Sequence, residues 1–366
     1  MTLEVFLAEW EDESPFMRVQ TSGSTGEPKP MLVEKRRMLA SARRTNDFLG
    51  LQKGDTALLC MSLDYIAGKM MVVRAIERGL RLISVDPSGH PLAVTQGDGS
   101  FVTSLADVTK EPSPCVSFAA MVPMQVYNSL QVPEECERLK QIKHLIIGGG
   151  AIDEVLAETL KTFPNHVWST YGMTETLSHI ALRRLSGPEA SDWYTPFPSV
   201  SVCLNDESCL VIDAPEVCAE ALVTNDIAEL ATQRGQTLMC SAHEGQSPCV
   251  INVPFKILGR KDNVICSGGV KIQADEVERL LCTYLREPYL ITKRPDEKFG
   301  EAVVLLTEGD TAAAKAVCEA VLQKYQHPKA YVHVSKIPLT ETGKPARRQA
   351  ELLALKANGT TGTAPL

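Results

Sequence analysis

Residues 56–85 read TALLCMSLDYIAGKMMVVRAIERGLRLISV, and this stretch decides the fold class. It opens with a short apolar run, Thr56–Met61, which is typical of a buried strand. Asp64–Arg78 then has the pattern of a helix, with its aspartate as N-cap and Gly79 as the residue that ends it. Arg81–Val85 is a second apolar run. Strands that alternate with helices in this way predict a parallel sheet covered on both faces.

The alternation continues outward from this stretch. His144–Ile147 is a further predicted strand, closed by the glycines at 148–150. Ala151–Phe163 is predicted to be helical, and Val167–Ser169 returns to the sheet. We therefore expect an α/β protein whose large N-terminal domain holds mostly parallel sheets covered by helices.

The pattern changes after residue 258. Gln273–Arg286 carries apolar residues at 277, 280, 281 and 284, the spacing of an amphipathic helix. Strands are predicted at 289–291, 302–306 and 331–334, with a helix at 311–325 between the last two. This indicates a small α+β unit, and the boundary is predicted in the polar stretch Gly259–Asn263.

Composition narrows the possible functions. The 366 residues include 37 basic and 45 acidic side chains, a net charge of −8, so general nucleic-acid binding is not expected. The first residues lack the pattern of a signal peptide, and no apolar run is long enough to span a membrane. The 11 cysteines are scattered without zinc-type spacing, which favours reduced thiols in a cytoplasmic protein.

Three segments carry residues suited to a nucleotide. Thr21–Pro30 (TSGSTGEPKP) is a glycine- and hydroxyl-rich loop that can wrap phosphate oxygens, although a flexible linker has the same composition. Tyr171–Thr176 (YGMTET) offers an aromatic face for a base, and a hydroxyl and a carboxylate for phosphate and Mg²⁺; a plain strand-end turn is the alternative. Pro338–Lys344 (PLTETGK) brings a lysine to the end of a Thr/Gly-rich loop.

Two shorter segments complete the set. Thr224–Asp226 (TND) supplies an aspartate that can accept both ribose hydroxyls, and Gly259–Asp262 (GRKD) supplies an arginine that can donate to them. In their order along the chain, with PLTETGK last, the five segments resemble the adenylate-forming (AMP-binding) superfamily of acyl-CoA synthetases, peptide-synthetase adenylation domains and luciferases. The resemblance extends over residues 18–350.

The resemblance implies a role for each matching residue. Lys344 would bridge the substrate carboxylate and the α-phosphate, Thr174 would contact the α-phosphate, and Glu175 would hold Mg²⁺. The residues that it places around ATP are Thr21, Ser22, Gly23, Ser24, Thr25, Gly26, Lys29, Gly149, Gly150, Tyr171, Gly172, Asp226 and Arg260.

The resemblance also implies a domain that moves. Residues 1–258 would form the large domain, 259–262 a hinge containing Asp262, 263–356 a small C-terminal lid, and 357–366 a flexible tail. Ser267, Gly268 and Gly269 would meet the thiol arm after the lid rotates. ATP, Mg²⁺ and coenzyme A are the implied cofactors and substrates.

Two departures from the family pattern stand out. The phosphate loop starts at residue 21, so most of the family's N-terminal subdomain is missing, and a homodimer that covers the exposed surface is plausible. The usual aromatic–x–Thr–Gly–Asp is here Leu222–Asp226 (LVTND), where asparagine can still adopt the left-handed turn.

Among relatives, the chain most resembles the o-succinylbenzoate–CoA ligases of menaquinone biosynthesis, on the segments TSGSTGEPKPM, MVPMQVYNSL, IIGGGAI and YGMTETLSHIALR. An aromatic dicarboxylate needs apolar walls and a polar or cationic anchor. The candidates for this acyl pocket are Gln125, Ser178, His179 and Arg183. Two alternatives remain open: an adenylation enzyme that loads another acid onto a carrier-protein arm, and a shortened, non-catalytic pseudo-ligase.

Overall fold

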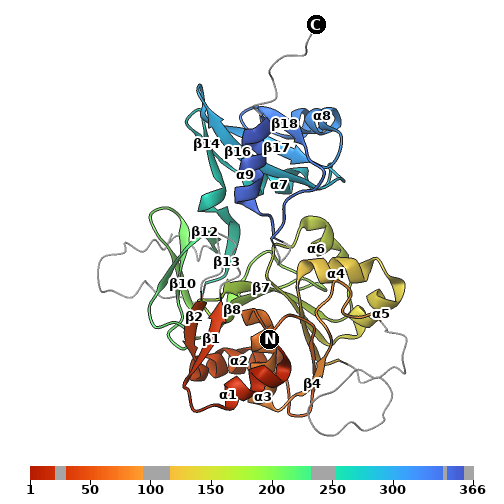
Figure 1. The fold of residues 1–366 in the computed structure, drawn as a ribbon, viewed down its shortest axis with the longest axis vertical. Helices are drawn as coiled ribbons and strands as arrows, with labels where there is room; N and C mark the ends of the chain where they lie inside the picture. Colours follow the sequence, from red (N-terminus) through yellow and green to blue (C-terminus); the bar gives the residue numbers. More distant parts are fainter. Residues whose placement is uncertain (21–29, 94–115, 232–252, 341–343, 358–366) are drawn as a thin grey trace.

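The computed structural model describes residues 1–20, 30–93, 116–231, 253–340 and 344–357, which form two lobes (Figure 1). We call residues 1–260 the N-terminal lobe and residues 264–357 the C-terminal lobe. The α-helices described are α1 (Leu3–Glu11), α2 (Lys35–Leu49), α3 (Ile66–Arg78), α4 (Pro123–Leu130), α5 (Pro133–Gln141), α6 (Glu154–Lys161), α7 (Ala274–Leu281), α8 (Thr311–Val321) and α9 (Arg347–Lys356).

A seven-stranded sheet forms the centre of the N-terminal lobe. In spatial order its strands are β4 (Arg81–Ser84), β3 (Thr56–Leu59), β5 (Phe118–Met121), β6 (His144–Ile147), β7 (His166–Met173), β8 (Ser178–Arg184) and β9 (Thr195–Pro196). Neighbours from β4 to β7 pair in parallel, and β8 and β9 are antiparallel additions. The α/β class expected from the sequence is confirmed.

Helices cover both faces of this sheet. Successive strand residues point to opposite faces, so Ala57 and Leu59 pack into one core with α2 and α3. Leu58, between them, packs into a second core with α4, α5 and α6. Buried on both faces, these strands are continuous apolar runs, which is why their sequence lacks a period of two.

Two antiparallel sheets of the N-terminal lobe were not predicted. β1 (Phe16–Gln20) and β2 (Pro30–Glu34) form a two-stranded ribbon. A four-stranded sheet has the order β10 (Ser201–Leu204), β11 (Cys209–Asp213), β12 (Leu222–Leu230) and β13 (Phe255–Arg260). Parallel pairing in this lobe is therefore confined to β3–β7 in the part of the chain that the structure describes.

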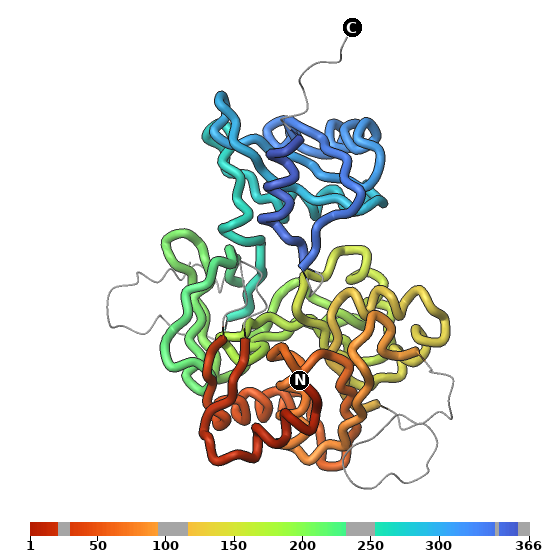
Figure 2. The backbone as a smooth tube through the Cα atoms, viewed as in Figure 1, coloured from red at the N-terminus to blue at the C-terminus, as the bar shows by residue number. Residues whose placement is uncertain are grey.

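The C-terminal lobe begins after a single 3₁₀ turn, Lys261–Asn263. Its five-stranded sheet contains β14 (Val264–Ser267), β15 (Val270–Gln273), β16 (Tyr289–Asp296), β17 (Gly300–Thr307) and β18 (Ala330–His333). Helices α7 and α8 pack on one core of this sheet and α9 on another. Figure 2 shows the chain passing from the N-terminal to the C-terminal lobe through β13, while the segments that end at residue 340 and start at residue 344 reach from the C-terminal lobe toward the N-terminal lobe.

Three local predictions were wrong. The helix predicted at 311–325 ends at Val321. Asp64 does not cap α3, because the helix starts at Ile66 after Tyr65 and has no side-chain cap; Asp64 instead pairs with the Met1 ammonium at 2.8 Å. Helix α7 ends at Leu281, not Arg286, and Tyr284 lies beyond it, 59% exposed. No helix among the described residues is long and apolar enough to cross a membrane.

Candidate active site

A cleft of about 3920 Å³ lies between the lobes and brings many of the predicted residues together. It is lined by residues from the carboxyl ends of the parallel strands, from β12 and β13, and from the start of α9. The predicted site residues in its lining are Gln125, Gly149, Gly150, Tyr171, Gly172, Thr174, Glu175, Ser178, His179, Arg183, Asp226, Arg260, Asp262 and Lys344. This edge of a parallel sheet is where ligands usually bind.

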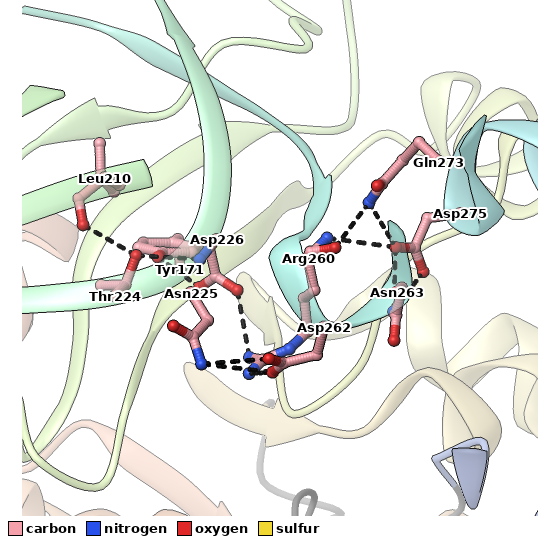
Figure 3. Close-up of polar contacts among 10 residues, drawn as sticks. All are labelled: Tyr171, Leu210, Thr224, Asn225, Asp226, Arg260, Asp262, Asn263, Gln273 and Asp275. Atoms are coloured by element: carbon pink, nitrogen blue, oxygen red, sulfur yellow. Dashed lines mark hydrogen bonds and ion pairs between the residues drawn. The ribbon is translucent and has the colours of Figure 1, made fainter. Parts of the chain in front are cut away.

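Asp226 and Arg260 form the best-defined polar pair of the cleft (Figure 3). They are direct partners in the antiparallel register of β12 and β13, and the Arg260 guanidinium donates to Asp226 Oδ1 at 3.2 Å. The Thr224 hydroxyl accepts a hydrogen bond from the Asp226 N–H at 3.1 Å and so fixes the backbone of Asp226. The pair offers an acceptor and a donor side by side, as the two hydroxyls of a ribose require.

Tyr171 contacts the same carboxylate from β7. Its hydroxyl donates to Asp226 Oδ2 at 2.6 Å, and its ring packs edge-on against Phe255, with 5.1 Å between centroids. Burial and the neighbouring Asp226 charge raise the pKa of Tyr171 well above its usual value, so the phenol stays protonated and donates. The ring is thereby held in one orientation at the wall of the cleft.

Asp262 lies in the 3₁₀ turn between the lobes. Its carboxylate accepts from Arg260 Nη2 at 2.9 Å and from the Asn225 amide at 3.3 Å. Arg260 thus sits between two carboxylates; burial lowers its pKa, but the hydrogen bond to Asp262 and the charge of Asp226 raise it overall. Asn225 replaces the family's glycine and contributes a contact to this turn.

Lys344 approaches this group from the C-terminal lobe. The Thr340 hydroxyl accepts from the Lys344 N–H at 3.1 Å, and its own backbone N–H donates to the Lys344 carbonyl at 2.7 Å. Burial and the positive charge of Arg260 lower the pKa of Lys344, while Asp226 opposes the shift. The hydrogen bonds fix the backbone of Lys344, and its side chain lines the same cleft as the Asp226–Arg260 pair, whose charges act on its pKa.

The segment 171–178 is a hairpin and not a simple strand-end turn. β7 continues through Gly172 to Met173, and β8 returns from Ser178. A Cβ at Gly172 would lie 2.2 Å from the Ser178 carbonyl oxygen, so only glycine lets the two strands approach here. Leu177 and Ser178 have φ of 53° and 98°, a strained conformation that tends to be kept at functional sites.

Thr174 and Glu175 occupy the bend of this hairpin. Thr174 is buried, whereas the Glu175 side chain is exposed in the cleft. The Glu175 carbonyl accepts a hydrogen bond from the Cys218 thiol at 3.2 Å, which fixes the bend to the neighbouring segment. The backbone that carries the Glu175 carboxylate is therefore fixed in position.

Arg74, on α3, is the site residue that the sequence reasoning missed. It is 1% exposed and lines the cleft, and no carboxylate pairs with its guanidinium in the described part of the chain. Nη2 donates to Ser178 Oγ at 2.9 Å and lies 3.5 Å from His179 Nδ1. Burial lowers the pKa of Arg74 to about 9, so it keeps its charge at neutral pH. In sequence it is an arginine of α3 with Glu77 three residues later, and no local pattern sets it apart; in the structure the Glu77 carboxylate is bound by Arg43 and Asn46 instead.

His179 orients this guanidinium. Its other nitrogen, Nε2, lies 3.0 Å from the Thr45 hydroxyl, which donates to the Ser41 carbonyl. Burial, and then the charges of Arg74 and Arg44, lower the pKa of His179 well below its usual value, so the ring is neutral. Nδ1 can then accept from Arg74 while Nε2–H donates to Thr45.

The remaining acyl candidates are already engaged. Arg183 donates to Asp192 Oδ1 at 2.9 Å, so its charge is compensated. The Gln125 amide is used by the backbone: it donates to Cys60 and Ser88 carbonyls and accepts from the Val122 N–H. Both line the cleft, but neither offers a free charge there.

Other predicted residues lie elsewhere. Ser267, Gly268 and Gly269 form the turn between β14 and β15 and are not among the residues that line this cleft. Residues 21–29, which hold Thr21, Ser22, Gly23, Ser24, Thr25, Gly26 and Lys29, lie outside the described residues. Gly149 and Gly150, in contrast, come after Gly148 at the end of β6 and do line the cleft.

The sequence and the fold were then compared with known proteins. A family model described as AMP-binding enzyme matches residues 7–220. The 2-succinylbenzoate–CoA ligase of Bacillus mycoides (strain KBAB4) is 24% identical over 371 residues, which cover 96% of this chain and 73% of the relative.

Solved structures agree with this family. An acyl-CoA synthetase (AMP-forming)/AMP-acid ligase II-like protein from Dyadobacter fermentans is 29% identical, with a TM-score of 0.57 over 96% of this chain and 92% of the other. The o-succinylbenzoate coenzyme A synthetase of Bacillus subtilis, in complex with ATP and magnesium ion, has a TM-score of 0.68 at 18% identity and shares the fold over 91% of this chain and 69% of its own. The chain therefore belongs to the family of AMP-binding enzymes, the adenylate-forming ligases whose motifs its sequence carries.

Proposed function

We propose that this protein is an ATP-dependent acid–thiol ligase that forms an acyl-adenylate, releases pyrophosphate and transfers the acyl group to coenzyme A. The observation that carries the proposal is that Lys344 lines the same cleft as the hydrogen-bonded pair Asp226–Arg260. A cation of one lobe and a ribose-type pair of the other thus border one space. That arrangement suits a reaction in which two anions, a carboxylate and a nucleotide, must come together.

The first step needs no protein nucleophile. A carboxylate oxygen of the substrate attacks the α-phosphorus of ATP, and pyrophosphate leaves. Lys344 stabilises the negative charge that builds up between the two anions, while Asp226 and Arg260 hold the ribose and Tyr171 bounds the base. In the second step the thiol sulfur attacks the acyl carbon, its proton is lost, and AMP leaves.

The chain fits Mg²⁺ held mainly by the nucleotide. The described residues contain no group of three or more His, Cys, Asp or Glu side chains that could hold a metal, but Glu175 presents one exposed carboxylate beside Thr174. Mg²⁺ is commonly bound by one or two carboxylates together with substrate phosphates. When bound, it would neutralise phosphate charge.

We propose o-succinylbenzoate as the acid, with Arg74 as the anchor for its second carboxylate. Arg74 is a buried cation without an acidic partner among the described residues, at the side of the cleft where Ser178 and His179 lie. A carboxylate placed there would gain a charge-assisted contact. The relatives named above act on a dicarboxylate of this kind by name.

The experiment that tests the function is pyrophosphate release, measured across a panel of carboxylates that includes o-succinylbenzoate, with and without coenzyme A. We expect release with the aromatic dicarboxylate and thioester only when coenzyme A is present. If no acid supported release, the non-catalytic pseudo-ligase would replace our proposal. Full turnover that never required coenzyme A would favour a carrier-protein acceptor.

The assignment of Asp262 as hinge leads to a separate prediction. Asp262→Pro fixes one backbone torsion in the turn between the lobes, so acyl-adenylate should form at a near-normal rate and accumulate, while thioester formation falls at least about tenfold. Single-turnover assays of each step measure the two rates. Asp262→Ala is the control, because it removes the contact to Arg260 without stiffening the backbone; an equal effect of both variants would contradict the hinge role.

A further inference from the structure

Side chains of the C-terminal lobe bind both backbone polar groups of Arg260, its N–H and its carbonyl. Arg260 is the last residue of β13, and its partner in the sheet is Asp226 of the N-terminal lobe. Its carbonyl accepts from Gln273 Nε2 at 3.0 Å, and its N–H donates to Asp275 Oδ2 at 3.2 Å. Figure 3 shows both contacts. The residue that pairs with Asp226 is thus bound directly by two side chains from beyond the 3₁₀ turn.

Gly259 makes this close contact sterically possible. A Cβ at this position would lie 1.9 Å from Gln273 Nε2 and 2.9 Å from Asp275 Oδ2, and its φ is +152°. Any other residue would displace both side chains or strain the backbone. The chain therefore leaves room at residue 259 for the two side chains that hold residue 260.

Asp275 connects this contact to the segment that carries Lys344. Besides the Arg260 N–H, its carboxylate accepts from Asn263 Nδ2 at 3.0 Å and from Arg347 Nη2 at 2.9 Å. Arg347 stands three residues after Lys344 and is the first residue of α9. It is fixed further by two bonds to Glu278, at 2.7 and 2.8 Å.

The Asp275 carboxylate therefore bonds to Arg260 on one side of the cleft and to Arg347, near Lys344, on the other. Another bond between the lobes, from Arg279 to Glu154 at 2.9 Å, joins side chains that are 57% and 49% exposed. Exposed ion pairs contribute little to stability. The hydrogen bonds of Asp275 are therefore better placed than this ion pair to fix the arrangement of the two lobes.

We propose that Gln273 and Asp275 are positioning residues that latch the C-terminal lobe in the arrangement in which Lys344 faces Asp226 and Arg260, and that the latch selects the acid-activating half of the reaction. The proposal rests on the two-step function proposed above. Both side chains grip Arg260, which precedes the turn at 261–263, and both belong to the lobe that follows it. A rotation of that lobe about the turn must break these bonds.

Two variants test the latch with different risks to folding. Gln273→Met keeps the side-chain length and removes the contacts to Arg260 and Asp275. Asp275→Asn removes the charge that joins Arg260, Asn263 and Arg347. The matched control for Asp275→Asn is Glu276→Gln, the same chemical change at the next residue, whose side chain is exposed. Each protein is assayed for acid-dependent ATP–pyrophosphate exchange and for thioester formation from supplied acyl-adenylate.

We expect both latch variants to lower the exchange rate about tenfold, while thioester formation from supplied adenylate stays within about twofold of wild type or rises. Glu276→Gln should match wild type in both assays. Equal losses in the two half-reactions, or no loss in either, would overturn the proposal.

A second measurement does not depend on activity. Trypsin cleavage after Arg260 or Lys261, identified by the mass of the new fragments, should be several-fold faster in Gln273→Met and Asp275→Asn than in wild type or Glu276→Gln. Unchanged cleavage would refute the latch. If wild type shows no exchange with any acid, the proposed function fails, and the cleavage rates still decide whether Gln273 and Asp275 hold the lobes together.

Discussion

Replacing Lys344 by alanine should lower the rate of acyl-adenylate formation by about a hundred- to a thousandfold, the usual effect of removing one preorganised group that stabilises developing charge. The half-buried ammonium of Lys344 lies within reach of Asp226 and Arg260, where carboxylate and phosphate would meet. Without it, two anions must approach each other with less compensation. Pyrophosphate release in a single turnover measures the effect.

The second half-reaction separates this role from a general loss of structure. Thioester formation from supplied acyl-adenylate should stay largely intact in Lys344→Ala, because the lysine acts only while the carboxylate and the α-phosphate react. Lys336→Ala is the control, since that lysine is exposed on the segment leading to the same loop. An equal loss of both half-reactions in Lys344→Ala would remove the assigned role.

Arg74→Met should raise the KM for o-succinylbenzoate by roughly 10- to 150-fold, which corresponds to the loss of one charge-assisted contact of about 1.5–3 kcal/mol. Methionine fills much of the same volume without the charge. A matched monocarboxylate that lacks the second carboxylate should be used about equally well by both proteins. Steady-state kinetics with the two acids measure this difference directly.

Arg74→Met should weaken substrate binding without lowering the thermal stability of the protein. The buried Arg74 guanidinium has no carboxylate partner in the described part of the chain, and replacing a poorly compensated buried charge by an apolar group is often neutral or stabilising. The Tm of Arg74→Met should therefore not fall below that of the control Arg81→Met, at an exposed arginine. Lower Tm together with poor use of both acids would indicate a structural role and contradict the anchor.

Much of the fold was accessible from local sequence. β6 was predicted at His144–Ile147 and lies there, since three consecutive apolar residues closed by glycines leave few alternatives. The antiparallel strands β8–β13 were not predicted, because their pairing depends on partners distant in sequence. Asp64 was taken for a helix cap because the type of residue is right, but the Met1 ammonium competes for its carboxylate.

The residues of the candidate site also differ in whether the sequence alone could identify them. Glycines, hydroxyls, Asp226, Arg260 and Lys344 could be chosen from the sequence, because a nucleotide demands those residue types and the motifs keep them in short, recognisable segments. Arg74 could not, since its role depends on Ser178 and His179, which are more than 100 residues away in sequence, and on the absence of a paired acid among the residues that the structure describes.

The sequence by itself determined the class of the fold, the family and the chemical types of the residues around ATP, because periodicity, glycine spacing and motif order are local properties. Only the tertiary structure decided which charges meet. The register of β12 on β13 pairs Asp226 with Arg260, the packing of α3 against β8 brings Arg74 to Ser178 and His179, and the contact of Gln273 and Asp275 with Arg260 joins the lobes. These are contacts between distant segments, whose energies depend on burial and geometry that no local pattern records.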